Sequence, residues 1–269
     1  MYPILFQIGP FSLYSLWLFV TIAFIAGSLS FAKTAKRHRL DLSMIFNHSI
    51  SILLVTLFMA RLVFFLINRQ IYLPVFRFVY LLQFFYIWDK GLSFWGGLLG
   101  FLIMLAIICF KRGENIMKWL DRMITPIGIG IIIANIGQFL DGQAYGTPTD
   151  LPWGVAYESI NVKYTVPVHP VQIYSIIYTT GILHIFKRFR KHEFFTQDGN
   201  KTLVAVTTYS FIRMFIESLR GDDTFEIFGI RLASVICAIM FVISGWILLK
   251  RFRQNDQNSH NTNTENGHN

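Results

Sequence analysis

The stretch ANIGQFLDGQAYGTPTDLPWG, residues 134–154, decides the fold of this chain. It continues an apolar run that starts at Ile124 and changes within a few residues into a polar loop punctuated by glycine and proline. Such a loop cannot lie in hydrocarbon, because its backbone groups would have no hydrogen-bond partners there. The polar residues at its start are too close together to share one helix face. We therefore expect some of them to point into a cavity or to the membrane interface: Asn135, Gln138, Asp141 and Gln143.

The composition around this stretch is that of an integral membrane protein. Of 269 residues, 54% are hydrophobic and only 14% are charged, with a mean hydropathy of +0.48. This is too apolar for an ordinary soluble domain. The net charge of +9 comes from short clusters between apolar runs, which are typical topology signals. We therefore expect a membrane-embedded protein and no nucleic-acid partner.

Seven apolar segments are long enough to cross a bilayer, which needs roughly 20 helical residues for each crossing. The fold class that they predict is an all-α polytopic membrane protein with seven transmembrane helices. We expect one membrane domain over residues 1–253 and a disordered cytoplasmic tail over 254–269, which is rich in Asn. The expected spans are 11–32, 47–68, 93–110, 119–140, 171–186, 202–219 and 232–249.

The loops between these segments predict the orientation. Fifteen Lys and Arg residues follow spans one, three, five and seven, whereas six lie in the loops on the opposite side. Positive residues accumulate on the cytoplasmic side. We therefore expect the N-terminus outside and the C-terminus in the cytoplasm, with the loop 141–170 on the outer side.

Ionisable side chains within a span are costly and are candidates for function. Tyr209, Arg213, Glu217 and Arg220 recur at spacings of four, four and three, so they lie on one stripe of span six. Arginine suits a phosphate because its planar guanidinium group can donate two hydrogen bonds. The alternative is a structural ion pair between helices.

Other polar or glycine-rich positions are weaker candidates. His169 precedes span five at the outer surface, where a positioning role is favoured over catalysis. Trp95, Gly96 and Gly97 open span three, where small residues let the backbone approach another group closely. Cys109 and Cys237 lie within spans, which predicts buried thiols rather than a disulfide. No zinc or redox spacing is present, so we expect neither metal nor cofactor.

Together these segments resemble the bacterial prolipoprotein diacylglyceryl transferase family over nearly all of residues 5–250. The resemblance depends on an ordered set of motifs: FQIGPFSL at 6–13, MARL at 59–62, LSFWGGLLG at 92–100, GQFLDGQAYGTPTDLPWGV at 137–155, HPVQIY at 169–174 and YSFIRMFIESLRGDD at 209–223.

The resemblance implies a seven-helix enzyme of the bacterial cytoplasmic membrane. Its activity would be transfer of the diacylglyceryl group of phosphatidylglycerol to the cysteine thiol in the signal peptide of a prolipoprotein. The implied partners are therefore phosphatidylglycerol and prolipoprotein signal peptides. Arg213 and Glu217 match the family's paired Arg and Glu, and Gly146 matches the glycine that closes its central signature.

Several positions depart from the family pattern. Trp95 replaces a histidine, and Asn135 replaces an arginine. Gln138, Asp141 and Gln143 replace two asparagines and a glutamate, in that order. Leu16 takes the place of a tyrosine, although Tyr14 lies two residues away. A working enzyme would use Arg213 for the phosphate, Glu217 to position it, and the amides of Asn135, Gln138 and Gln143 as neutral donors. The alternatives are a catalytically silent relative that binds lipid or a signal-peptide helix, and an enzyme with a changed donor or acceptor.

Overall fold

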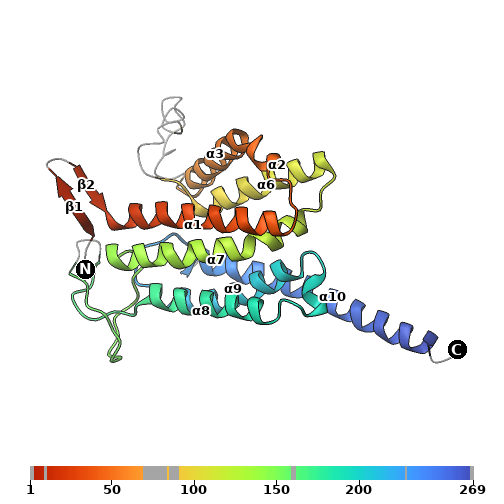
Figure 1. Cartoon of the computed structure of the whole chain (residues 1–269). Helices are drawn as coiled ribbons and strands as arrows, with labels where there is room; N and C mark the ends of the chain where they lie inside the picture. Colours follow the sequence, from red (N-terminus) through yellow and green to blue (C-terminus); the bar gives the residue numbers. More distant parts are fainter. Residues whose placement is uncertain are drawn as a thin grey trace. The chain divides into compact units, whose positions relative to one another are not determined.

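The computed structural model describes residues 3–8, 11–68, 84, 91–158, 162–227 and 229–266. The chain divides into two compact units: residues 1–34 with 120–269, and residues 35–119. The fold is mostly helical, as the sequence predicts (Figure 1). Among the described residues, five helices are long and apolar enough to cross a membrane.

The first unit begins with a hairpin rather than a helix. Strand β1 (Ile4–Ile8) pairs antiparallel with β2 (Phe11–Tyr14), and helix α1 (Ser15–Arg37) follows. The prediction that the first span starts at residue 11 is therefore wrong by four residues. The physical reason is local, because Gly9–Pro10 favours a turn between two short apolar segments. The buried Ser15 closes the hairpin, since its backbone N–H donates to the carbonyl of Pro3 at 2.9 Å.

The remaining helices of this unit follow the predicted spans closely. The strands β3 and β4 form a second short hairpin before the last helix. The elements are α7 (Ile116–Asp141), α8 (Val171–Arg188), the 3₁₀ turn η2 (Glu193–Thr196), α9 (Asn200–Ser218), β3 (Glu226–Ile227), β4 (Ile230–Arg231) and α10 (Leu232–Asn266).

Helix α10 extends well beyond its apolar part. Its membrane-compatible segment ends at Gln254, but the helix continues to Asn266, unlike the disordered tail expected from composition. No Gly or Pro occurs between Trp246 and Asn266 that would end the helix. Helices α8 and α9 are more polar than the five membrane-compatible helices. The crossing of the membrane by α8 and α9 therefore stays a prediction.

Small residues let the helices of the first unit pack closely. A Cβ atom on Gly137 of α7 would lie 2.6 Å from Cβ of Phe19 in α1, and one on Gly128 would lie 2.8 Å from the Leu183 side chain in α8. Glycine is common at such contacts in membranes, where close packing replaces the hydrophobic effect. These glycines fix the end of α7 that leads into the loop 142–170.

The second unit contains α2 (Ser43–Phe46), α3 (Ser49–Ile67) and α6 (Phe94–Arg112). Helices α3 and α6 pack along each other through Gly96 and Gly100, whose added Cβ atoms would lie 2.4 Å from the Met59 carbonyl oxygen and 2.8 Å from the Met59 Cβ, respectively. The buried Arg61 donates to the carbonyls of Phe84 and Gly91, at 3.1 and 2.9 Å. These bonds show that Arg61 holds the chain that leads into α6.

Candidate functional site

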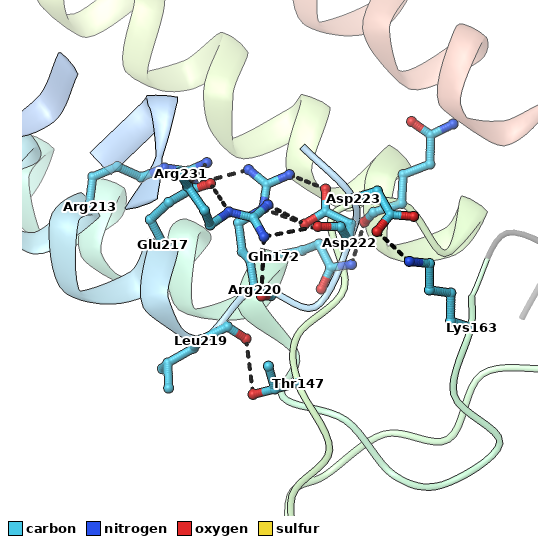
Figure 2. A network of polar contacts seen from close by, with 11 residues as sticks. Thr147, Lys163, Gln172, Arg213, Glu217, Leu219, Arg220, Asp222, Asp223 and Arg231 are labelled. Carbon is cyan, nitrogen blue, oxygen red and sulfur yellow. Dashed lines mark hydrogen bonds and ion pairs between the residues drawn. The ribbon is translucent and has the colours of Figure 1, made fainter. Parts of the chain in front are cut away.

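A buried carboxylate at the C-terminal end of α9 gathers three arginines (Figure 2). Glu217 has no exposed surface. Its Oε2 lies 2.9 Å from Nη2 of Arg213 and 3.5 Å from Nη1 of Arg220, and its Oε1 lies 3.0 Å from Nε of Arg231. A buried carboxylate is tolerated only when it is paired in this way.

Two local features bring these groups together. Arg213 and Glu217 are one helical turn apart on α9, as the sequence predicts, and Arg220 follows the helix end. Arg231 comes from the opposite side, because the β3–β4 hairpin turns the chain back at Gly229, which has a φ of 75°. Figure 2 shows Arg213 and Arg231 approaching Glu217 from different elements.

Asp222 connects the two arginines beyond the helix end. Its carboxylate accepts hydrogen bonds from Nε of Arg220 at 2.9 Å and from Nη2 of Arg231 at 2.8 Å. Burial raises the pKa of the Asp222 carboxyl, but the two guanidinium groups outweigh that effect and hold its pKa below the ordinary value. Three guanidinium groups therefore face two carboxylates, which leaves the cluster with one net positive charge.

Gly146 anchors the long loop against this cluster. Its N–H donates to the His169 carbonyl at 3.0 Å, and its backbone pairs with that of Arg220. A Cβ atom there would lie 2.5 Å from both Cβ and the carbonyl oxygen of His169. The neighbouring Thr147 N–H donates to the Leu219 carbonyl at 2.8 Å. Only glycine leaves room for this approach, so Gly146 determines where the loop meets the arginines.

A cavity of about 300 Å³ opens beside Arg220. Lys163 reaches across the loop to Asp223, as Figure 2 shows. The lining is mainly polar and comes from three segments, which are the end of α7, the loop 142–170 and the residues that follow α9: Gln138, Gln143, Ala144, Tyr145, Lys163, Arg220, Asp222 and Asp223. The cavity offers cationic and amide donors to a ligand of this size.

The amide side chains near the C-terminal end of α7 and just after it are only partly directed to this cavity. Gln138 and Gln143 line it, whereas Asn135 donates from its side chain to the Ile131 carbonyl of its own helix at 2.8 Å. Asp141 is 3% exposed, and its carboxylate accepts a hydrogen bond from the Gln143 side chain. The loop is further held by Gln172, whose Nε2 donates to the Gln143 carbonyl at 2.6 Å.

His169 forms a chain of side-chain contacts on the other face of the loop. Its Nδ1 lies 3.2 Å from the Tyr174 hydroxyl, which accepts a hydrogen bond from Nε1 of Trp153 at 2.8 Å. The backbone of His169 pairs with Thr147 and Gly146. The positioning role of His169 stays a prediction.

Trp95, Gly96 and Gly97 belong to the second unit, at the start of α6. Trp95 is half-buried, with its ring 5.6 Å from that of Phe94. Gly96 packs on Met59, Ala60 and Val63 of α3, which accounts for that glycine by packing. Substrate binding by these three residues stays a prediction.

Sequence reasoning missed Arg231 and Asp222, which complete the cluster. The sequence presents Arg231 only as a charge in a loop, because it lies eleven positions beyond Arg220 and outside the helical stripe. The available signal was the segment EIFGIR at 226–231, in which a glycine between two short β-prone pairs predicts a hairpin. Among the described residues, no group of three or more His, Cys, Asp and Glu side chains is arranged to hold a metal ion.

The fold and the cluster define a helical membrane protein with a net positive site beside a polar cavity. The family model described as prolipoprotein diacylglyceryl transferase matches residues 3–250. The chain therefore belongs to the prolipoprotein diacylglyceryl transferase family.

Curated relatives agree with this assignment. The chain is similar to proteins named phosphatidylglycerol–prolipoprotein diacylglyceryl transferase from three bacteria. The Clostridioides difficile protein is 30% identical over 83% of this chain and 84% of its own length. The Legionella pneumophila protein (strain Corby) is 27% identical over 91% and 95%. The Finegoldia magna protein is 29% identical over 61% and 62%, so the chain spans somewhat less than two thirds of that relative.

Proposed function

We propose that this protein transfers the diacylglyceryl group of phosphatidylglycerol to the thiol of the lipobox cysteine of prolipoproteins. The observation that carries the proposal is the cluster of Arg213, Arg220 and Arg231 around a buried glutamate, in a chain of this family. One net positive charge, held in place by carboxylates, suits an anionic phosphate ester. The names of the relatives supply the two substrates.

The transfer reaction builds up negative charge on the departing phosphate, and the arginine cluster can stabilise that charge. The cysteine sulfur attacks the glyceryl carbon that bears the phosphate, so a C–S bond forms while the C–O bond to phosphate breaks. The thiol releases its proton to water, and the departing glycerol phosphate carries one negative charge more than the phosphodiester did. Fixed cations near the phosphate stabilise that growing charge more than they stabilise the substrate, which accelerates the reaction.

Within this proposal, Arg213 binds the phosphate and Glu217 positions Arg213. Arg213 is suited to this because its side chain keeps 19% of its surface exposed, whereas Glu217 keeps none. Gln138 and Gln143 donate from the cavity wall, and Arg220 adds charge at its edge. Gly146 and His169 hold the loop, while Asn135, Asp141, Trp95, Gly96 and Gly97 shape the surroundings of the substrate.

The proposed setting is the bacterial cytoplasmic membrane, crossed seven times. The five apolar helices and the excess of Lys and Arg in alternate loops support this topology. In the proposed orientation the N-terminus is outside, the C-terminus is in the cytoplasm, and the loop 142–170 with the arginine cluster lies at the outer face. Signal peptides that reach this face would present their cysteine to the cavity.

The test is transfer of labelled diacylglyceryl from phosphatidylglycerol to a lipobox peptide by the full chain in nanodiscs. We expect labelling that requires the peptide cysteine and is lost with Arg213→Ala. Arg112→Ala removes an exposed arginine from the last turn of α6 and is the matched control, which should keep full activity. A folded protein that labels no peptide would contradict the proposal.

One observation favours a second candidate, a silent or retargeted relative that binds lipid or a signal-peptide helix. Asn135 stands where the family has arginine, and its amide is bound by its own helix. Trp95 cannot accept a proton in place of the family's histidine. Phosphatidylglycerol binding without transfer would support the silent relative, whereas clear preference for another lipid donor would support the retargeted enzyme.

A further inference from the structure

A second cavity lies at the opposite end of α9 from the arginine cluster. It has a volume of about 380 Å³, within the range of roughly 300–1,000 Å³ that is typical of ligand pockets. Residues that follow α8, the turn η2 and one turn of α10 form its walls. All seven lining residues except His192 are apolar: Phe189, His192, Phe194, Phe195, Leu248, Leu249 and Phe252.

The walls of this groove are built and held in place. The ring of Phe194 packs 5.6 Å from that of Phe195 and 6.2 Å from that of Phe252, which connects η2 to α10. Arg251 fastens the same turn of α10, because its Nη1 donates at 2.8 Å to both the Asp198 carbonyl and Oδ1 of Asn200. Ring packing and the hydrogen bonds of Arg251 therefore hold the walls of the groove in place.

The lining is nevertheless open to the surroundings. Leu249 is 61% exposed, Phe252 is 55% exposed and Phe189 is 47% exposed. Apolar surface of this kind needs a cover, and in a membrane protein lipid chains can supply it. The charges around the groove decide which lipid fits.

The sequence KRFR occurs on both sides of the groove, at 187–190 and at 250–253. The phenylalanine of each copy, Phe189 and Phe252, lines the groove, so each of these two wall residues has cations directly beside it in the sequence. Six of the nearby cations are exposed, against one exposed acid, Glu193, in residues 187–197 and 248–254. These cations are Lys187, Arg188, Arg190, Lys191, Lys250 and Arg253.

We propose that this groove binds one anionic phospholipid, with an acyl chain against the aromatic walls and the headgroup phosphate among the KRFR cations. Clusters of Lys and Arg beside the end of a membrane helix favour anionic lipid headgroups. Helix α9 has 19 residues and is therefore about 28 Å long, so the groove is separate from the Arg213 cluster at its other end. This lipid is bound for structure or regulation and is not the donor at the arginine cluster.

The test is photolabelling of the full chain in phosphatidylcholine nanodiscs that contain a small, equal fraction of diazirine-bearing phosphatidylglycerol or phosphatidylcholine. Labelled positions are mapped by peptide mass spectrometry. Because each Lys or Arg near the headgroup contributes about 1 kcal/mol, or about fivefold, we expect the anionic probe to label peptides from 186–200 and 246–254 at least about fivefold more than the zwitterionic probe.

Two variants separate the cations from the apolar walls. Replacing Lys187, Arg188, Arg190 and Lys191 together by Gln should lower anionic labelling at least about fivefold, which is the contribution of one cation at the headgroup. Phe252→Gln keeps every cation but interrupts the wall, and it should also lower labelling. The matched control replaces Lys33, Lys36, Arg37 and Arg39 by Gln, an equally exposed basic cluster without this groove, and should leave labelling at these peptides unchanged.

Three results would overturn the proposal. Equal labelling by both probes would mean that the groove takes any acyl chain. Competition by free glycerol phosphate would mean a site for a soluble anion instead of a lipid. An equal loss in the control variant would mean general surface charge. Each readout is independent of diacylglyceryl transfer, so the proposed function and this inference can fail separately.

Discussion

A buried carboxylate lies at each end of α9, and the two carboxylates differ in the groups that donate hydrogen bonds to them. At the N-terminal end, Asp121 of α7 is 7% exposed and accepts from the backbone N–H groups of Gly199 and Thr202, both at 2.8 Å, and from the Thr202 hydroxyl at 2.7 Å. At the C-terminal end, the Glu217 carboxylate accepts from three arginine side chains.

The difference lies in what surrounds each negative charge. Backbone N–H groups at the start of α9 donate hydrogen bonds to the Asp121 carboxylate. Asp121 therefore caps α9 and connects it to α7. At the C-terminal end, three guanidinium groups face only the two carboxylates of Glu217 and Asp222. The C-terminal end of α9 therefore keeps one net positive charge. A buried carboxylate can therefore secure a helix or present cations, depending on whether its donors are neutral or charged.

The largest expected effect is on Arg213. Arg213→Ala should lower transfer about 100- to 1,000-fold, because removing one fixed donor to a developing oxyanion has an effect of that size. Arg213→Lys should restore part of the rate, since it returns the charge without the planar fork. Initial rates at saturating lipid measure both. An unchanged rate for Arg213→Ala would remove the C-terminal cluster from the mechanism.

The comparison of the two carboxylates is tested by Glu217→Gln and Asp121→Asn, which remove each charge with little change of shape. Glu217→Gln should lower the free energy of unfolding by about 3 kcal/mol, because it leaves buried guanidinium groups unbalanced. It should also slow transfer. Asp121→Asn should cost about 2 kcal/mol by weakening three hydrogen bonds.

The decisive readout for this pair is transfer per folded molecule, measured beside denaturation in detergent. Asp121→Asn should keep that rate, and Glu217→Gln should not. If both variants lost transfer in proportion to stability alone, the distinction between the two ends of α9 would be wrong.

The fit of the loop against the cluster is tested by Gly146→Ala. The added Cβ would meet the His169 backbone, so unfolding should become easier by about 2 kcal/mol, a usual cost of overpacking. Gly181→Ala on α8 is the matched control, because nothing lies within 4 Å of its Cβ position. The control should gain about 0.5–1 kcal/mol through helix propensity. Equal effects of the two changes would contradict the close approach at Gly146.

The smallest expected effect concerns pH and Asp222. Its folded pKa lies below the unfolded value of about 3.9, so its stabilisation is fully present above that value and is lost as pH falls through the folded pKa. Asp222→Asn should therefore lower the melting temperature at pH 7, by an amount equivalent to about 1 kcal/mol. The difference between variant and parent should shrink as pH falls from about 4 through the lower, folded pKa of Asp222, and it should vanish only below that folded pKa. A difference that did not change with pH across this range would assign the stabilisation to shape rather than charge.

The sequence predicted the helices well because apolar runs of this length have few alternatives in a membrane. Six of the seven predicted segments begin within about three residues of an observed helix. The first was predicted too early, since periodicity alone could not separate a four-residue strand from the first turn of a helix. The stripe formed by Arg213, Glu217 and Arg220 was also predictable, because helical spacing fixes which residues share a face.

By itself, then, the sequence determined the helical class, the family and the ion pair on α9. Only the tertiary structure decided that Arg231 and Asp222 complete the cluster, that Asn135 binds its own helix, and that Gly146 meets His169. The reason is physical. Contacts within one helix follow from its repeat, whereas contacts between elements depend on where a turn such as Gly229 sends the chain, which no local spacing encodes.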